Sequence, residues 1–111
     1  MPDIKIQVDG DLVVGRTSTV TAGFVNPLPK ALSKGSFLIE GPGLDNPLKI
    51  SVKQKIPPSE ETKVVFQLTP RTEGPKSIMA KFSSKELSDV DGWREVLVKT
   101  LGDNNTRSNE V

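Results

Sequence analysis

The sequence predicts an all-β protein folded as one antiparallel β-sandwich of about seven strands, followed by a disordered C-terminal tail. Apolar residues recur at every second position in seven short runs, which is the period of a strand with one buried face. Nine glycines and nine prolines fall mainly between these runs. No stretch repeats its apolar residues every three or four positions, so no long helix is predicted.

The seven runs follow one another along most of the chain. The first alternates Ile4, Ile6 and Val8 with polar residues, and the others are built in the same way. Their apolar positions are Val20, Ala22 and Phe24; Phe37 and Ile39; Leu48, Ile50 and Val52; Val64, Phe66 and Leu68; Ile78, Ala80 and Phe82; and Val96 and Val98. We therefore expect each strand to bury one face and expose the other, as in antiparallel sheets with one wet side.

Turn-forming residues separate the runs. They are Asp9-Gly10, Asn26-Pro27, Gly41-Pro42-Gly43, Asn46-Pro47, Pro57-Pro58, Gly74-Pro75 and Asp91-Gly92. Glycine reaches positive φ and proline fixes φ, so both residues favour tight turns. Short strands with turns at this spacing are typical of an immunoglobulin-like sandwich. The antibody type is not expected, because the chain has neither cysteine nor tyrosine.

A chain of 111 residues suits a single domain, which we place at residues 1–100, with residues 101–111 as the disordered polar tail. The net charge of +1 gives no overall attraction to nucleic acid. No apolar run approaches the ~20 residues of a membrane-spanning helix. No signal peptide is visible, so we expect a cytoplasmic protein, with release by a leaderless route left open.

The absence of cysteine and histidine limits the chemistry of this chain. It has no thiol nucleophile, no imidazole base and no thiolate or imidazole metal ligand. Two aspartate pairs, Asp9/Asp11 and Asp89/Asp91, lie next to glycine turns and are interpreted as turn residues rather than calcium ligands. We predict no catalytic, cofactor-binding or metal-binding residue in the chain.

Five residues are candidates for an interface. Trp93 is the only tryptophan and precedes the last apolar run, so it either caps the end of the core, which is the favoured interpretation, or anchors a partner. Lysines at positions 49, 53, 63 and 81 (Lys49, Lys53, Lys63 and Lys81) are expected on wet outer faces. Such lysines attract an acidic partner or protect a sheet edge from aggregation.

Two stretches carry a resemblance to a known family. The segment "GFVNPLPKALSKGSFLIEGPGL" at residues 23–44 and the segment "EGPKSIMAKFSSKELSDVDGWREVLV" at residues 73–98 resemble the last C-terminal β-barrel domain of animal transglutaminases, including invertebrate members. The motif positions to which the resemblance assigns a structural role are Asn26, Pro27, Leu28, Glu40, Gly41, Gly43, Leu44, Gly74 and Gly92. The resemblance covers about residues 2–99.

The resemblance implies a non-catalytic module of a protein-glutamine γ-glutamyltransferase. In that family the acyl-transfer residues are a cysteine, a histidine and an aspartate in an upstream domain that also needs calcium. The expected partners are the other domains of the parent enzyme, with further protein partners left open. The resemblance thus implies a regulatory or docking module with no cofactor of its own. The alternative is a free-standing immunoglobulin-like domain for binding or adhesion.

Overall fold

The structure, a computed structural model, describes residues 3–100, and the tail predicted at residues 101–111 lies outside this range. It contains eight strands and confirms the all-β immunoglobulin-like class. The strands are β1 (Lys5–Val8), β2 (Leu12–Val13), β3 (Ser18–Val25), β4 (Gly35–Glu40), β5 (Leu48–Val52), β6 (Glu61–Leu68), β7 (Gly74–Ser83) and β8 (Val90–Lys99). Within the described residues no helix is long and apolar enough to cross a membrane.

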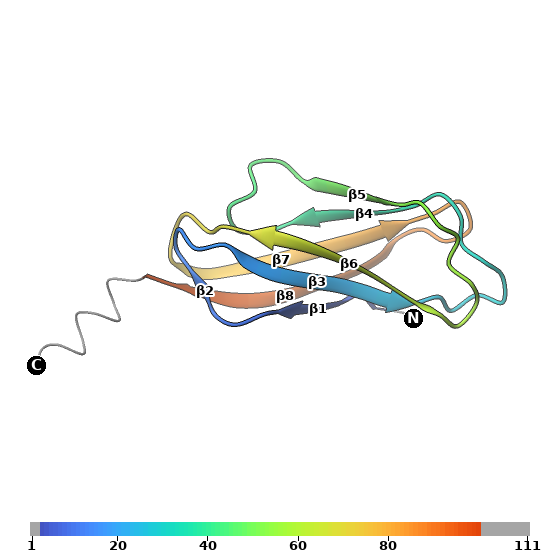
Figure 1. The fold of residues 1–111 in the computed structure, drawn as a ribbon, viewed down its shortest axis with the longest axis horizontal. Helices are drawn as coiled ribbons and strands as arrows, with labels where there is room; N and C mark the ends of the chain where they lie inside the picture. The colour runs from blue at the N-terminus through green and yellow to red at the C-terminus, as the bar shows by residue number, and fades with distance from the viewer. Residues whose placement is uncertain (1–2, 101–111) are drawn as a thin grey trace, which may run out of the picture.

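The strands form two sheets that run along the long axis of the molecule (Figure 1). One sheet has the order β1-β3-β6 and the other has the order β2-β8-β7-β4-β5. All pairings are antiparallel except that of β2, which runs parallel to the end of β8. The prediction of about seven antiparallel strands therefore lacks one element: β2 has only two residues, too few to show an alternation.

The core between the two sheets contains the apolar residues that the alternation predicts. Phe24 comes from the three-stranded sheet, whereas Phe37 and Phe82 come from the five-stranded sheet. The ring centroids of Phe24 lie 6.2 Å from Phe37 and 4.7 Å from Phe82, and those of Phe37 and Phe82 are 5.1 Å apart. These tilted and edge-to-face contacts join the two sheets through aromatic packing.

Asn26 joins two loops at one end of the sandwich. Its side chain is almost fully buried, with 1% exposed. The amide nitrogen donates to the carbonyl oxygens of Lys30, Ile56 and Pro57 at 2.9, 3.0 and 3.2 Å, and the amide oxygen accepts from the backbone N–H of Leu28 at 2.9 Å. The Asn26-Pro27-Leu28 motif is therefore a buried clamp between the β3–β4 and β5–β6 connections.

The N-terminal segment lies against the start of β8. The backbone N–H of Ile4 donates to the carbonyl oxygen of Asp91 at 3.2 Å. A Cβ atom at Gly92 would collide with the backbone carbonyl of Ile4. Only glycine leaves room for this crossing, which gives a physical reason for a glycine at this motif position.

The other motif residues border the connection after β4. Gly41, Gly43 and Leu44 follow Glu40, the last residue of that strand. Gly43 has a φ of +87°, and a Cβ atom there would collide with the backbone of Thr69. Gly74 is the first residue of β7 and directly follows the β6–β7 connection. Glycine is thus needed where the β4–β5 loop packs against the β6–β7 loop.

Candidate interaction surface

The outer face of the five-stranded sheet carries a group of exposed apolar side chains. We call this group the Trp93 face and define it as Leu38, Met79, Trp93 and Leu97. Leu38 is 40% exposed, Met79 42%, Trp93 63% and Leu97 60%. They come from β4, β7 and β8, which are neighbours in the sheet. Exposed apolar groups that lie together in this way are more informative than the same residues scattered singly.

Strand register brings three of these side chains together. Met79 lies directly opposite Trp93 on one side and opposite Glu40 on the other. Leu38 pairs with Lys81, which is two residues from Met79 and points to the same side of β7. Directly paired and diagonal neighbours on one sheet face are within reach of long side chains, so Leu38, Met79 and Trp93 form one diagonal patch.

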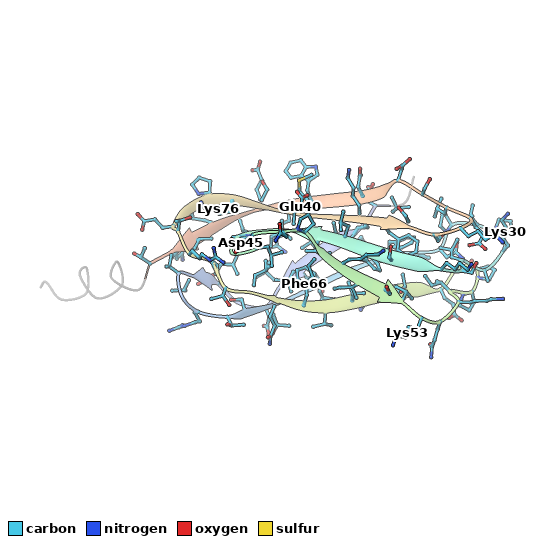
Figure 2. The ribbon with its side chains drawn as sticks, turned by 90° about the horizontal axis from the view of Figure 1, so that it is seen from above. Lys30, Glu40, Asp45, Lys53, Phe66 and Lys76 are labelled. Carbon is cyan, nitrogen blue, oxygen red and sulfur yellow. The ribbon has the colours of Figure 1, made fainter. Side chains whose placement is uncertain are left out.

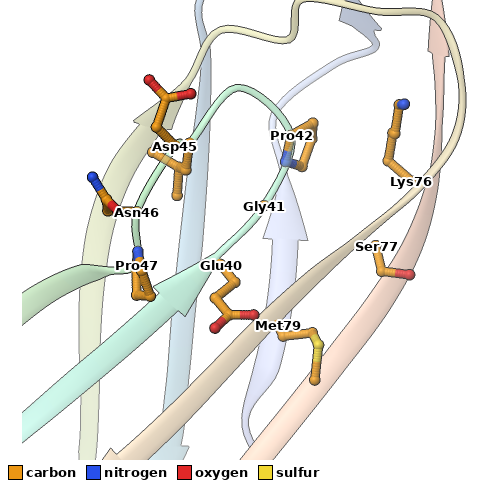
Figure 3. Close-up of a pocket in the computed structure, with 10 residues that line it drawn as sticks. Glu40, Gly41, Pro42, Asp45, Asn46, Pro47, Lys76, Ser77 and Met79 are labelled. Atoms are coloured by element: carbon orange, nitrogen blue, oxygen red, sulfur yellow. The ribbon is translucent and has the colours of Figure 1, made fainter.

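Two hollows border this patch. The smaller, about 100 Å³, is lined by Leu38, Glu40, Met79 and Lys81. The larger, about 500 Å³, also contains Glu40 and Met79 and extends to the β4–β5 loop. Figure 3 shows Pro42, Asp45, Asn46 and Pro47 along that loop, with Lys76, Ser77 and Met79 on the neighbouring strand.

An ion pair fixes the loop that borders the larger hollow. Arg71 donates to both carboxylate oxygens of Asp45, at 2.7 and 3.1 Å. This hydrogen bond and the guanidinium charge lower the pKa of the Asp45 carboxyl below its ordinary value. Both side chains are exposed, so the pair orients the loop more than it stabilises the fold.

Charged residues surround the Trp93 face. Those on the same outer face, by strand register and alternation, are Glu40, Lys49, Lys81, Asp91, Glu95 and Lys99. Both signs of charge are present, so the rim favours neither a purely acidic nor a purely basic partner. An apolar centre with a polar rim is the usual composition of a protein–protein interface.

The structure places Trp93 differently from the favoured interpretation. The residue does not cap the core: β8 begins three residues earlier, at Val90, and Trp93 points outward from its middle part. The alternation along β8 sends Val90 and Val98 inward and Trp93, Glu95 and Leu97 outward. The remaining interpretation, that Trp93 anchors a partner, is compatible with this exposure.

The four predicted lysines do not form one basic surface. Lys49 and Lys81 lie on the outer face of the five-stranded sheet, and Lys53 directly follows β5. Lys63 lies on β6 in the other sheet, with its ammonium 3.7 Å from the Glu61 carboxylate. Figure 2 shows Lys30 and Lys53 toward one end of the sandwich and Asp45 and Lys76 toward the opposite end.

Three residues of the Trp93 face, Leu38, Met79 and Leu97, are missing from the predicted interface residues. Each is a large apolar residue at a position that the alternation sends outward. A large apolar residue at an outward strand position is the sequence signal that identifies each of them as exposed. Their grouping depends on the order β8-β7-β4, which the sequence does not state.

Comparisons with known proteins agree with this architecture. The family described as "Transglutaminase family, C-terminal ig like domain" matches residues 2–100. Annulin of Schistocerca americana is 49% identical over 98 residues, which cover 88% of this chain and 13% of annulin. Protein-glutamine gamma-glutamyltransferase 2 of Pagrus major is 35% identical over 97 residues, which cover 87% of this chain and 14% of that enzyme.

Solved structures give the same result. The crystal structure of red sea bream transglutaminase matches with a TM-score of 0.83 and 35% identity, over 88% of this chain and 15% of that chain. The CARDB domain of the PF1109 protein from Pyrococcus furiosus has a TM-score of 0.71 at 16% identity, over 88% of this chain and 87% of that domain, which shows likeness of fold alone. The chain thus spans about one seventh of the length of its transglutaminase relatives, and it belongs to the transglutaminase family as a C-terminal immunoglobulin-like domain.

Proposed function

We propose that this chain is a non-catalytic docking or regulatory module of a calcium-dependent transglutaminase. The observation that carries the proposal is the extent of the match: the relatives are transglutaminases, and the chain corresponds to 13% to 15% of their length. The chain has no cysteine and no histidine, so a thiolate–imidazole pair for acyl transfer has to come from another part of the enzyme. Calcium is assigned to that other part.

The module acts by docking against the rest of the enzyme and leaving it. Docking of a domain is a two-state equilibrium, and a ligand shifts it only by binding one state more tightly than the other. Calcium or substrate bound to the catalytic part therefore changes the docked fraction when it favours one arrangement. A released module leaves its outer surface free for other protein partners.

The test compares the full-length enzyme that contains this chain with a variant that lacks residues 3–100. Transfer of a fluorescent amine to a glutamine substrate is measured over a range of calcium concentrations. We expect the truncated enzyme to keep the transfer reaction and to change its calcium dependence. A folded truncated enzyme without transfer activity would contradict the non-catalytic role, and an unchanged calcium response would contradict regulation.

The free-standing binding or adhesion domain has a separate test. An antibody to this chain is used to measure the mass of the native polypeptide in an extract of the source organism. The module predicts a band several times larger than 12.0 kDa, with cross-linking activity in the same fraction. A native band near 12.0 kDa would favour the free-standing domain instead.

A further inference from the structure

We propose that the free edge of β6, beneath β5, binds an extended segment of a partner protein that has apolar residues at every second position. The segment adds a fourth strand to the three-stranded sheet, the mode of recognition known as β-augmentation. The inference goes beyond the proposed function and does not depend on it, because the site lies within this domain alone. Two observations carry it: the direction of the backbone groups of β6 and the incomplete burial of β5.

The pairings of β3 show which backbone groups of β6 are unpaired. The N–H of Asp9 donates to the carbonyl oxygen of Thr19 at 3.0 Å, and the N–H of Asn26 donates to that of Glu60 at 2.9 Å. Both bonds continue the registers of β3 with its two neighbours, so odd-numbered residues of β3 bond to β1 and even-numbered residues bond to β6. The β6 residues opposite the odd-numbered ones therefore direct their N–H and C=O groups to the free edge; they are Glu61, Lys63, Val65 and Gln67.

No other strand occupies this edge in the part of the chain that the structure describes. β6 is the last strand of its sheet, and the backbone hydrogen bonds of the described loops involve none of residues 61–67. The strand contains no proline and only one lysine, Lys63, so it has few of the features that protect sheet edges from pairing. A row of unpaired N–H and C=O groups at a spacing of two residues matches the backbone of another extended chain.

The edge of the facing sheet extends beyond β6. On the opposite side of the sandwich, the N–H of Ile4 bonds to Asp91 and the guanidinium of Arg94 donates to the carbonyl oxygen of Ile6 at 3.1 Å, so β1 lies under β8. Counting strands across from there places β3 under β7 and β6 under β4, and no strand of the described chain lies under β5. Figure 2 views the molecule from the β5 side, with Phe66 of β6 labelled.

The burial of β5 agrees with this missing neighbour. Its core-facing residues pair with Phe37 and Ile39 of β4, which are fully buried. The core-facing residues of β5 itself are only half-buried, and they are Leu48, Ile50 and Val52. A strand added to β6 takes the position under β5 and covers these three side chains.

The two sheets define the chemistry of the bound segment. Directly paired residues on neighbouring strands point to the same face of a sheet. Residues of the segment opposite Val64 and Phe66 therefore point inward, against the half-buried side chains of β5, and have to be apolar. Residues opposite Lys63 and Val65 point to solvent and are polar. The segment thus alternates apolar and polar residues over about six positions, the usual length of a strand.

The overhang of β5 favours a single segment over a second copy of this domain. Neighbouring strands lie about 4.8 Å apart and facing sheets about 10 Å apart, so one strand fits beside β6 and below β5. A second sandwich would bring its own facing sheet into the space that β5 already occupies. The geometry therefore accepts a segment that has no second layer.

Amide hydrogen exchange, followed by NMR, tests this inference on the isolated chain, which has a complete core of its own. The probe is a synthetic peptide of alternating valine and threonine with a lysine at each end. The control peptide has the same amino acids in an order without alternation. We expect the saturating probe to slow exchange of the outward amides of Lys63, Val65 and Gln67 about tenfold, because they become hydrogen-bonded. The amides of Val64 and Phe66, already bonded to β3, should change little.

A matched pair of variants separates the backbone from the side chain. Val65→Pro removes an outward N–H without taking a bond from the pairing with β3, as proline is tolerated on edge strands. We expect it to weaken binding of the probe about tenfold or more, from the lost donor and the ring at the edge. Val65→Ser keeps the N–H and changes only a side chain that points to solvent, so its affinity should stay within about twofold of wild type.

A second pair tests the contact with β5 and does not depend on the folding of the proline variant. Ile50→Thr makes a half-buried, core-facing side chain of β5 more polar, and we expect it to weaken binding about fivefold. Ser51→Thr is the control, because Ser51 is exposed on the other face of the same strand. Its affinity for the probe should not change.

Four results would overturn the inference. Failure of the probe to bind at about millimolar concentration, or equal binding of the control peptide, would refute an edge that selects alternating segments. Binding that leaves the three outward amides unchanged would place the peptide elsewhere. Slowing that grows with the concentration of the chain alone would identify a second copy as the occupant. Protection of these amides in the full-length enzyme without peptide would identify a segment of the enzyme itself.

Discussion

The outer faces of the two sheets meet the same solvent but differ in composition. Among the described residues, six large apolar residues are exposed, and four of them form the Trp93 face of the five-stranded sheet. The three-stranded sheet exposes Val65 in the middle of a strand and Val25 at a strand end. Its other outward positions are largely polar, such as Gln7, Thr19 and Thr21.

This difference separates what the fold requires from what it leaves exposed. The core is complete without the Trp93 face, since the aromatic rings of Phe24, Phe37 and Phe82 pack between the sheets. A polar residue would serve equally well at an outward strand position, as the three-stranded sheet demonstrates. The exposed apolar side chains of that face are therefore not required by the fold.

The largest expected effect comes from breaking the crossing of the N-terminal segment over the core-facing side of β8. Gly92→Ala adds a Cβ atom that collides with the carbonyl of Ile4, so the N-terminal segment has to move away from β8. We expect a loss of about 3 kcal/mol in the free energy of unfolding, as for overpacked sites. Urea denaturation of the isolated chain measures this loss.

Gly10→Ala is the control for backbone conformation. Gly10 has a φ of +82°, but a Cβ atom there would meet nothing within 4 Å. Its cost should therefore be about 1 kcal/mol, from the left-handed conformation alone. If both variants lost the same amount, the crossing at Gly92 would not be a steric requirement.

The clamp at Asn26 should give the next largest effect. Asn26→Ala removes the amide that joins two loops and leaves buried carbonyl groups without that donor. We expect a loss of about 2 kcal/mol in the free energy of unfolding, by the usual cost of unsatisfied buried groups. Asn46→Ala is the control, because Asn46 also precedes a proline but is exposed, and its loss should stay within about 0.5 kcal/mol. Equal losses would show that the buried hydrogen bonds of Asn26 contribute little.

How much of this arrangement the sequence predicts depends on the range of the interactions. Alternation is a local signal, and it identifies seven of the eight strands and the buried phenylalanines. The two-residue strand β2 (Leu12–Val13) exists because its residues pair with the end of β8, more than 80 positions later. A pairing between such distant residues leaves no recognisable pattern in the sequence around β2.

The candidate surface follows the same rule. The outward direction of Trp93 could be read from Val96 and Val98, since residues at odd positions of that strand point the other way. The assignment of Lys49 and Lys63 to different sheets could not be predicted in this way, because it depends on the order of the strands in each sheet. The approach of Ile4 to Gly92 is likewise a long-range contact, visible beforehand only as a motif glycine.

The comparison of the two faces predicts a small effect on stability for surface substitutions. In the isolated chain, Trp93→Ser and Val65→Ser should each change the free energy of unfolding by about 0.5 kcal/mol, because both side chains are more than 60% exposed. The measurement is again urea denaturation, with the heat stability of the two variants compared in parallel. A loss above about 2 kcal/mol for Trp93→Ser alone would mean that Trp93 belongs to the fold and not to an interface.

The smallest effect is expected at Glu86, in the connection between β7 and β8. Its carboxylate accepts hydrogen bonds from the Ser33 hydroxyl at 2.7 Å and from the Ser33 backbone N–H at 2.6 Å. These bonds lower the pKa of Glu86 below its ordinary value of 4.5. The carboxylate therefore stabilises the fold above that value, and this contribution is lost as the pH falls through the lower pKa of the folded state.

Glu86→Gln should remove this pH dependence, because glutamine does not ionise. We expect wild type to be slightly more stable than the variant at neutral pH and the difference to shrink as the pH falls below about 4.5. Denaturation curves of both proteins between pH 7 and pH 3 measure it. A stability difference that persisted unchanged to the lowest pH would show that the Glu86–Ser33 contact acts through packing and not through charge.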